Sequence, residues 1–401
     1  MYTRIQYSKK SVGLIKLLYF LLYASAASWM TYFYVFLEGE RALNGTQIGI
    51  LAAMQQINNI VFLPLWGMIS DRYGKRRIYL LLLFFTTFLL LGFLYHGGFV
   101  FYLCFIVLFS AINNPIGALI DSFAIDKAKE THIESSYGKM RLWASLGWSI
   151  SAFATGYLIK YSNIKVIFPL ASAILLITWI VSYFYLNKKR VTQSTVNPSI
   201  SAIKELLTTN KNLLLFFIFL FFYYVLNAPT LMFINLYYKE IGASNSQIGI
   251  AFAVQSIFEI PFLFFGASLI EKFGIKRIII FTLLVAALRM MLYGFTSNPW
   301  IAIAVGCSHG ITLGLFLVAA IEYTHRIVPQ SQNSTGQTLF YTFLGLGTSI
   351  GNFLNGLMKD YLSLKHAMKI DAVLIILLVI GALFYNHYTI KKEKPQRLSE
   401  V

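Results

Sequence analysis

Three ionisable side chains lie deep inside apolar stretches of the second half of the sequence. Glu259, Arg289 and His309 each fall near the middle of a run of about 20 mostly apolar residues, the length needed to cross a bilayer. Charges in a membrane are costly, so each is a candidate functional residue. A carboxyl group in an apolar, intermittently wet cavity beside a cation can take up and release a proton. We therefore predict that Glu259 carries a proton, with Arg289 as the nearby cation and His309 as a further coupling group.

Bland alternatives remain open for these three residues. Glu259 and Arg289 could form a static ion pair that only joins two helices. His309 could make a plain helix–helix hydrogen bond. In the first half, Asp121 and Arg141 lie at similar depths in two neighbouring apolar stretches. A functional pair would have Arg141 contact substrate while Asp121 neutralises it or shares the proton, and the alternative is that both are solvated residues at the membrane interface.

Amide and aromatic side chains near the centres of other apolar stretches predict a cavity for a polar solute. Rings can stack on a ring-bearing solute while amides bind its polar groups. Any one of these side chains could equally serve in packing or in an interfacial belt. Pro115 should also distort its helix, since proline frees a backbone carbonyl. The predicted lining comprises Tyr23, Trp29, Asn58, Asn59, Asn113, Asn114, Trp148, Tyr223, Tyr224, Asn227, Gln255 and Tyr341.

The composition places all these residues in an integral membrane protein. Of 401 residues, 57% are hydrophobic and 12% are charged, whereas soluble proteins carry about 25% charged residues. Both cysteines, Cys104 and Cys307, lie in apolar runs, so no disulfide framework is indicated. An all-α fold of twelve transmembrane helices is predicted over 15–37, 47–69, 78–95, 99–124, 138–160, 165–186, 212–238, 246–270, 277–296, 299–324, 334–357 and 367–389.

The basic residues report topology and exclude a nucleic-acid partner. The net charge is +17, but most of the 33 Lys and Arg residues fall in the tails and in the loops that follow even-numbered spans. By the positive-inside rule, both termini and these loops are cytoplasmic. The first apolar run continues to Leu37, which is too long for a cleaved signal, so it is expected to remain as a span.

A duplication organises the chain. Residues 47–78 and 247–278 are two versions of one segment, since Gln47-Ile48-Gly49-Ile50 recurs as Gln247-Ile248-Gly249-Ile250. We therefore predict two six-helix bundles, 1–190 and 212–401, joined by a cytoplasmic linker over 191–211. Two similar bundles can rock against each other around a central site, as many secondary transporters do.

The turn between the second and third spans resembles the signature loop of the major facilitator superfamily. It reads Gly67-Met-Ile-Ser-Asp71-Arg72-Tyr73-Gly74-Lys75-Arg76-Arg77, and a degenerate copy occupies Ala267–Arg277. The resemblance implies a gate in which Asp71, Arg72, Gly74, Arg76 and, in the copy, Glu271 make contacts that change as the bundles rock. Helix depth places Glu322 at the cytoplasmic surface beside His325 and Arg326, in a gating or structural role.

Within that superfamily the chain is most similar to the proton symporters that include lactose permease, nucleoside–proton symporters and phenylpropionate permeases. Arg141 and Trp148 resemble the Arg-x6-Trp segment with which lactose permease holds its sugar, and Arg289 and His309 have that permease's spacing. The acid that follows its histidine by one turn is Thr312 here. The position of Glu259 resembles the nucleoside symporters more closely.

These observations predict a transporter of the cytoplasmic, or inner, membrane. We expect proton-coupled uptake of a nucleoside or sugar, with an aromatic acid less favoured, by a monomer in the lipid bilayer. No Walker loop, metal-ligand cluster or nucleophile elbow is present in the sequence, so no enzyme activity, cofactor or metal is expected, although sodium coupling stays open. The alternatives are a proton-driven exporter, a membrane enzyme acting on lipid-linked substrates, and a transporter-like receptor.

Overall fold

Every regular element in the described part of the chain is a helix. The computed structural model describes residues 2–131, 136–186, 206–208 and 210–398, so the predicted linker over 191–211 lies largely outside the described residues. The helices of the first half are α1 (Tyr2–Met30), α2 (Phe33–Arg41), α3 (Gly45–Tyr73), α4 (Lys75–Gly92), α5 (Phe99–Asn113), α6 (Pro115–Thr131), α7 (Ser136–Tyr161), η1 (Ile164–Val166) and α8 (Ile167–Tyr185). Those of the second half are α10 (Lys211–Leu231), α11 (Ile234–Glu240), α12 (Asn245–Phe273), α13 (Ile275–Phe295), α14 (Pro299–Gly306), η2 (Gly310–Leu315), α15 (Phe316–Ile327), η3 (Gln330–Gln332), α16 (Asn333–Tyr361) and α17 (Leu364–Leu398).

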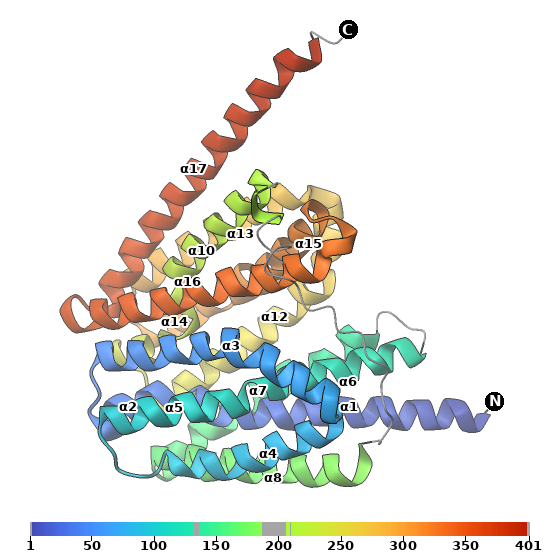
Figure 1. The fold of residues 1–401 in the computed structure, drawn as a ribbon. Coiled ribbons are helices and arrows are strands. Elements are labelled where there is room, and N and C mark those ends of the chain that lie inside the picture. Colours follow the sequence, from blue (N-terminus) through green and yellow to red (C-terminus); the bar gives the residue numbers. More distant parts are fainter. Residues whose placement is uncertain (1, 132–135, 187–205, 209, 399–401) are drawn as a thin grey trace.

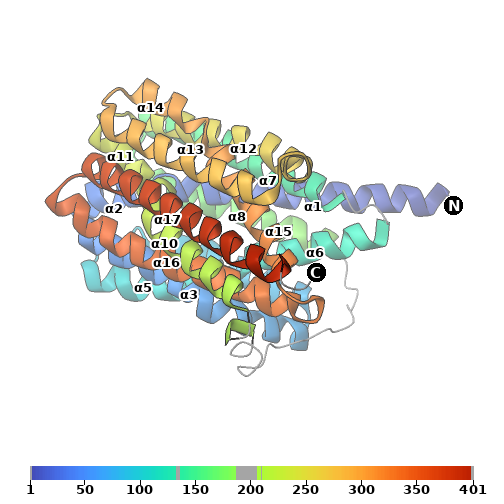
Figure 2. The same ribbon diagram turned by 90° about the horizontal axis from the view of Figure 1, so that it is seen from above.

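Within the described residues, 10 helical segments are long and apolar enough to cross a membrane. The two predicted spans outside this set are α4, which begins with Lys75, Arg76 and Arg77, and α16, which buries Asn352 and Asn355. Both still lie lengthwise among the others (Figure 1, Figure 2), α4 beside α8 and α16 beside α3 and α10. The protein is thus an all-α membrane protein of twelve transmembrane helices in two six-helix bundles, as predicted.

The repeated Gln-Ile-Gly-Ile segment marks a helix start in each half. The side chain of Asn44 accepts a hydrogen bond from the N–H of Gln47, and the Gln47 side chain accepts one from the N–H of Asn44. Ser244 and Gln247 form the same capping box at the start of α12. Each box pairs two backbone donors that a helix end would leave free. The duplication therefore preserved a capping motif as well as an apolar pattern.

The first span of each bundle is interrupted at equivalent positions, where the sequence predicted one continuous helix. α1 ends at Met30 and α2 begins at Phe33, while α10 ends at Leu231 and α11 begins at Ile234. Pro229 lies just before the second break and cannot donate a backbone hydrogen bond. We call these two interruptions the helix breaks at 31–32 and 232–233.

Two further spans are irregular at mid-height. As expected from Pro115, the fourth span is interrupted at Asn114, between α5 and α6. The tenth span contains the π-helix η2, which the sequence did not predict. Such bulges inside membrane helices often occur at functional sites.

The bundles meet along two seams, α3 against α16 and α7 against α12. A Cβ added to Gly49 would lie 2.7 Å from the backbone oxygen of Asn352, and one added to Gly249 would lie 2.5 Å from that of Ala152. No side chain fits at such distances, so glycine is what allows these helices to approach so closely. Gly249 lies 200 positions after Gly49, and Asn352 lies 200 positions after Ala152. The two seams are therefore copies of each other.

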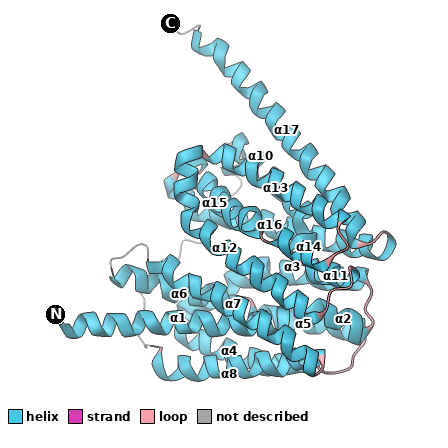
Figure 3. Ribbon diagram, turned by 180° about the vertical axis from the view of Figure 1, so that it is seen from behind, coloured by secondary structure: helices cyan, strands magenta, loops and turns pink. Residues whose placement is uncertain are grey.

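The seams are tied most strongly where α3 begins, at what we call the closed end: Glu38, Gly45, Thr46, Lys359 and Asp360. The Asp360 carboxylate accepts hydrogen bonds from the N–H groups of Gly45 and Thr46, at 2.6 and 2.8 Å. Lys359 forms an ion pair with Glu38 of the other bundle. Toward the opposite end, α12 and α16 tilt away from α3 and α7 (Figure 1, Figure 3). The bundles are therefore packed together at one end and diverge at the other.

Candidate functional site

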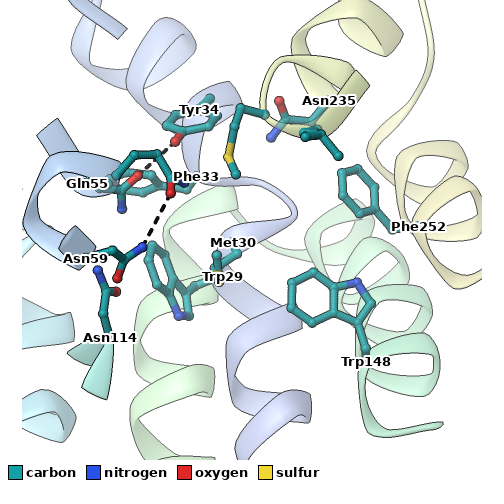
Figure 4. Close-up of a pocket in the computed structure, with 13 residues that line it drawn as sticks. Trp29, Met30, Phe33, Tyr34, Gln55, Asn59, Asn114, Trp148, Asn235 and Phe252 are labelled. Carbon is teal, nitrogen blue, oxygen red and sulfur yellow. Dashed lines mark hydrogen bonds between the residues drawn. The ribbon is translucent and has the colours of Figure 1, made fainter. Parts of the chain in front are cut away.

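A cavity of about 210 Å³ lies between the two bundles, at the level of the helix breaks. Figure 4 shows Trp29 and Trp148 on different sides of it, with Asn59 and Asn114 close together in its wall. Residues at or beside both helix breaks line it, so each half of the duplicated chain contributes to the site. The lining residues are Trp29, Met30, Phe33, Tyr34, Gln55, Gln56, Asn59, Asn114, Trp148, Leu231, Met232, Asn235 and Phe252.

Contacts between the two breaks close the cavity on the side of the closed end. Asn235 donates a hydrogen bond to the backbone oxygen of Thr31 at 3.0 Å. The Tyr34 ring stacks on Phe233, with ring centroids 6.1 Å apart, and its hydroxyl donates to Gln55 at 2.9 Å. Because Thr31 and Asn235 belong to different bundles, this layer must open whenever the closed end opens.

The lining combines rings with amides and carries no charged side chain among its described residues. Several amides keep hydrogen-bonding capacity for a ligand. The side-chain nitrogen of Asn59 lies 3.4 Å from the Gln56 side-chain oxygen, and that of Asn113 lies 3.5 Å from the Asn114 side-chain oxygen. Both distances are long for hydrogen bonds. A ring-bearing solute could stack on the aromatic faces and replace these weak contacts with shorter ones.

The first bundle holds a compact ionic cluster. Of the two alternatives for Arg141 and Asp121, the structure has the pair, with N and O atoms 3.1 Å apart. Arg141 also donates to the Tyr23 hydroxyl at 3.1 Å, and Tyr19 donates to Asp121 at 2.6 Å. The Arg141 and Asp121 side chains are 41% and 31% exposed. The pair is therefore held firmly yet remains open to solvent.

The second bundle holds a buried cluster around Arg289, which is only 2% exposed. One terminal nitrogen contacts His309 Nδ1 at 3.1 Å and Thr312 Oγ1 at 2.9 Å. The other lies 3.4 Å from both the Gln255 side-chain oxygen and the Tyr293 hydroxyl. A guanidinium group can only donate, so His309 Nδ1 must accept, and the neutral ring carries its proton on Nε2.

The Glu259–Arg289 ion pair, considered as the static alternative for these residues, is not formed. Gln255 lies one helical turn before Glu259 on the same face of α12, and it is Gln255 that contacts Arg289. Glu259 is partly exposed and lies instead against the π-helix, where a Cβ on Gly314 would be 3.2 Å from its Cγ. It interacts electrostatically with Arg141 across the gap between the bundles. The positive charge that acts on Glu259 is therefore Arg141 of the first bundle, not Arg289.

Several residues predicted for the lining lie elsewhere. Tyr223 is buried and donates to the backbone oxygen of Thr312 at 3.2 Å. Asn227 is buried and accepts from Thr230 at 2.7 Å. These two and Gln255 pack inside the second bundle, because depth in the membrane does not fix which way a helix face points. The other predicted lining residues outside the cavity are Tyr23, Asn58, Asn113, Tyr224 and Tyr341. Arg141, predicted to contact substrate, also lies outside it.

Tyr341 lies on α16 of the second bundle. Tyr341 is 49% exposed. Its side chain is not part of the cavity lining.

The signature loop is anchored inside the first bundle in this conformation. Gly74 and Gly274 end α3 and α12 with φ of 97° and 84°, a backbone region that favours glycine. Arg76 donates to the backbone oxygen of Leu186, at the end of α8, at 2.7 Å. Arg72 lies over the Tyr73 ring. The gating role of the signature loop therefore stays a prediction.

The acidic residues predicted for gating contact little across the gap. Asp71 and Glu271 form no ion pair with any described residue. Glu322 pairs with Arg326, four residues along α15, with N and O atoms 2.9 Å apart. A gate that uses Asp71 would have to form in another conformation.

The model of the MFS_1 like family matches residues 13–370. The chain belongs to the MFS_1 like family. It is a major facilitator superfamily transporter, as the signature loop and the duplication predicted. A multi-pass transporter of this kind binds a small-molecule substrate within the bilayer.

Relatives of this MFS_1 like transporter cover nearly its whole length. It is 29% identical over 374 residues to the uncharacterized transporter YwbF of Bacillus subtilis, covering 92% of each chain. It is 28% identical to the maltose permease of Geobacillus stearothermophilus, covering 86% of each. The crystal structure of the nucleoside transporter NupG matches with a TM-score of 0.81 and 16% identity, covering 92% of this chain and 98% of that one. At that identity the match with NupG concerns the fold alone.

Sequence reasoning missed the part of this transporter's cavity that the helix breaks supply. Neither break contains a glycine that would predict it, and the first break has no proline nearby. The available signal was the duplication, since a break near Pro229 implies one at the equivalent place in α1. The lining residues missed, beside the breaks and on the neighbouring helices, were Met30, Phe33, Tyr34, Gln55, Gln56, Leu231, Met232, Asn235 and Phe252.

A buried carboxylate was also missed. Asp371 in α17 is 5% exposed, on the same helix face as Met368, Ala372 and Ile375. It lies near the start of the last predicted span, 367–389. The four-residue spacing with its buried neighbours was the signal that could have found it.

Proposed function

We propose that this transporter takes up a small uncharged solute, a nucleoside or a sugar, in symport with protons by alternating access. The observation that carries the proposal is the cavity at the helix breaks, where rings and amides alternate and the described lining has no charge. Such a lining suits a solute with a ring and several hydroxyl or amide groups. It disfavours an aromatic acid, whose carboxylate would lose its water there without gaining a cation.

The size of the cavity and the names of relatives support the same class. A volume of about 210 Å³ is below the ~300–1,000 Å³ of drug-sized sites, which favours a small solute. Relatives include a maltose permease, the sucrose permease of Escherichia coli and its putative nucleoside transporter YegT. The solutes in these names are all neutral and ring-bearing.

Glu259 is the proposed proton carrier. It is partly exposed, lies against Gly314 of the π-helix and faces Arg141 across the gap. When the bundles rock, the distance between Glu259 and Arg141 changes, and with it the balance between the charged and the neutral carboxyl group. A solute that holds the bundles together would thereby link its own movement to proton binding.

In the proposed orientation, the protein lies in the inner membrane with both termini in the cytoplasm. The closed end, with Asp360, then faces outward, and the diverging end faces the cytoplasm. In that orientation, we assign this structure to the step at which an imported solute is released. The amides in the lining favour uptake over the export of apolar compounds.

Counterflow in proteoliposomes tests the solute class without requiring a coupling ion. Vesicles preloaded with unlabelled solute are given the same labelled solute outside, in separate nucleoside, sugar and aryl-acid pools. We expect exchange with a neutral pool, lost in Trp148→Ala and reduced in Asn114→Ala. Trp300→Ala is the matched control, because Trp300 is 57% exposed and does not line the cavity. Exchange of aryl acids alone, or full exchange by Trp148→Ala, would refute the proposed site.

A further inference from the structure

The helix break at 31–32 interrupts a segment that has no helix-breaking residue. The segment reads Ser28-Trp-Met-Thr-Tyr-Phe-Tyr-Val35, with neither glycine nor proline. Tyr32 keeps a right-handed backbone, with φ of −116° and ψ of −2°, so modest rotations would bring it to helical values. The break at 232–233, in contrast, has Pro229 beside it. The first break is therefore held by contacts rather than by its own sequence.

The second bundle supplies the bond that a continuous helix would make within itself. In an unbroken helix the Thr31 oxygen would accept from the N–H of Val35, four residues on. No such bond occurs among the backbone bonds of the described residues. Asn235 of α11 donates to that oxygen instead, at 3.0 Å, while its own oxygen accepts from the N–H of Leu236 at 2.8 Å. Asn235 is 2% exposed, so its amide takes the place of the missing helix bond.

Other contacts of the same segment also come from the second bundle. The Tyr32 hydroxyl lies against Gly249 of α12, whose added Cβ would be 2.6 Å from it. The Tyr34 ring stacks on Phe233, just before α11. Together with the bond from Asn235, these contacts join the break to the second bundle. All of them are lost when the bundles separate at the closed end.

We propose that Asn235 is a positioning residue that maintains this break, and that α1 and α2 join into one helix when the closed end opens. Once Asn235 has moved away, the N–H of Val35 becomes the partner of the Thr31 oxygen. Phe33 and Tyr34, the first residues after the break, line the cavity, so joining and breaking move part of its wall. The joining rests on the alternating access proposed above and links the gate to the solute site.

Val35→Pro distinguishes the two forms of the segment. In the broken form Val35 is the third residue of α2, and its N–H has no partner within the helix, so proline is tolerated there. In a joined helix the same proline would lose a bond and clash with the Thr31 oxygen. Val35→Ala is the matched control, because it also removes the buried Val side chain but keeps the N–H.

Thermal unfolding without solute compares Val35→Pro with Val35→Ala in two backgrounds. In the wild type we expect Tm values within about 1 °C of each other. In Gly249→Val, whose wedge keeps the closed end open, Val35→Pro should unfold about 5 °C lower than Val35→Ala. Gly49→Val places an equivalent wedge in the other seam and repeats the comparison if Gly249→Val does not fold. An equal cost of the proline in both backgrounds would overturn the joining.

The same comparison in two further backgrounds tests the role of Asn235. Asn235→Leu keeps the shape of the side chain and removes the donor, so the proline should again cost about 5 °C. Asn227→Leu is the matched control, because Asn227 is an equally buried amide, 3% exposed, that accepts from Thr230 within α10. There the proline should stay within about 1 °C of Val35→Ala. An equal cost in both would contradict the positioning role.

Transport gives an independent check. Val35→Pro should bind a neutral solute as Val35→Ala does, yet exchange it in counterflow about tenfold more slowly, because the closed end cannot open without the joined helix. Full exchange by Val35→Pro would contradict the joining. A wild type that binds no neutral solute would refute only the proposed function, because the thermal comparisons need no solute.

Discussion

Asp360 at the end of α16 accepts hydrogen bonds from both the N–H and the hydroxyl of Thr46 at the start of α3, at 2.8 and 2.6 Å. A carboxylate at a helix start also interacts favourably with the helix dipole. The equivalent residue of the other seam, 200 positions earlier, is Lys160, which cannot cap the start of α12 in this way. The duplicated seams thus differ in charge, and only one of them carries this carboxylate.

Replacing Asp360 by Asn should weaken the closed end. Charge-assisted bonds to two backbone donors and a hydroxyl would become weaker neutral ones, and because the side chain is exposed we expect a loss of about 1 kcal/mol. The measurement is thermal unfolding at pH 7. Lys160→Asn is the matched control and should leave Tm nearly unchanged. Equal Tm values for wild type and Asp360→Asn would show that the contact contributes nothing.

The same contact should make stability depend on pH. Partial burial raises the pKa of Asp360, but hydrogen bonds from Thr46 and Gly45 and the nearby Lys359 outweigh it and hold the pKa below its usual value. A lowered pKa in the folded state means that the stabilisation is complete above the ordinary pKa of about 3.9 and is lost as the pH falls through the lowered value. Titrating Tm downward from neutral pH should therefore show an acid-side decrease that is smaller in Asp360→Asn. An unchanged decrease would contradict this assignment.

Enlarging Gly249 should prevent the closed end from forming. A Val side chain there would clash with the Ala152 backbone oxygen, which lies 2.5 Å from an added Cβ. We expect solute binding to survive while counterflow falls at least tenfold, because the bundles can no longer alternate. Binding by tryptophan quenching and exchange by counterflow are measured on the same sample. Gly13→Val is the control, because no atom lies within 4 Å of its added Cβ; normal exchange by Gly249→Val would refute the role of the seam.

Arg141 should couple the ionic cluster to transport. Arg141→Lys keeps the charge but loses the geometry that contacts Asp121 and Tyr23 together, whereas Arg141→Gln loses both. We expect uphill accumulation to be reduced in the first variant and absent in the second. Accumulation of labelled solute under an imposed pH gradient measures this. Full accumulation by Arg141→Gln would remove this residue from the coupling scheme.

The sequence predicted the fold well because its signals are local or periodic. Span lengths, the duplicated Gln47 and Gln247 segments and the interruption at Pro115 all follow from composition and spacing. Equal depth made a pair of Asp121 and Arg141 one of two alternatives, and the pair forms because the two side chains point toward each other.

Equal depth failed for Glu259 and Arg289 because Gln255, one turn earlier on α12, contacts the guanidinium group instead. The break at 31–32 could not be predicted locally, since Met30-Thr31-Tyr32 contains no helix breaker. That break is stabilised by tertiary contacts, including the bond from Asn235 of the other bundle. Side-chain direction and long-range contacts were thus the missing information.

Lumenal pH in proteoliposomes, followed as nucleosides or sugars are added outside with no imposed ion gradient, tests proton coupling at Glu259 most directly. The account predicts a pH change with one neutral solute class, absent in Glu259→Gln although that variant still exchanges solute in counterflow. Repeating the addition with and without sodium separates proton coupling from sodium coupling. A solute-specific pH change that persists in Glu259→Gln, or transport that depends on sodium and moves no protons, would contradict the account.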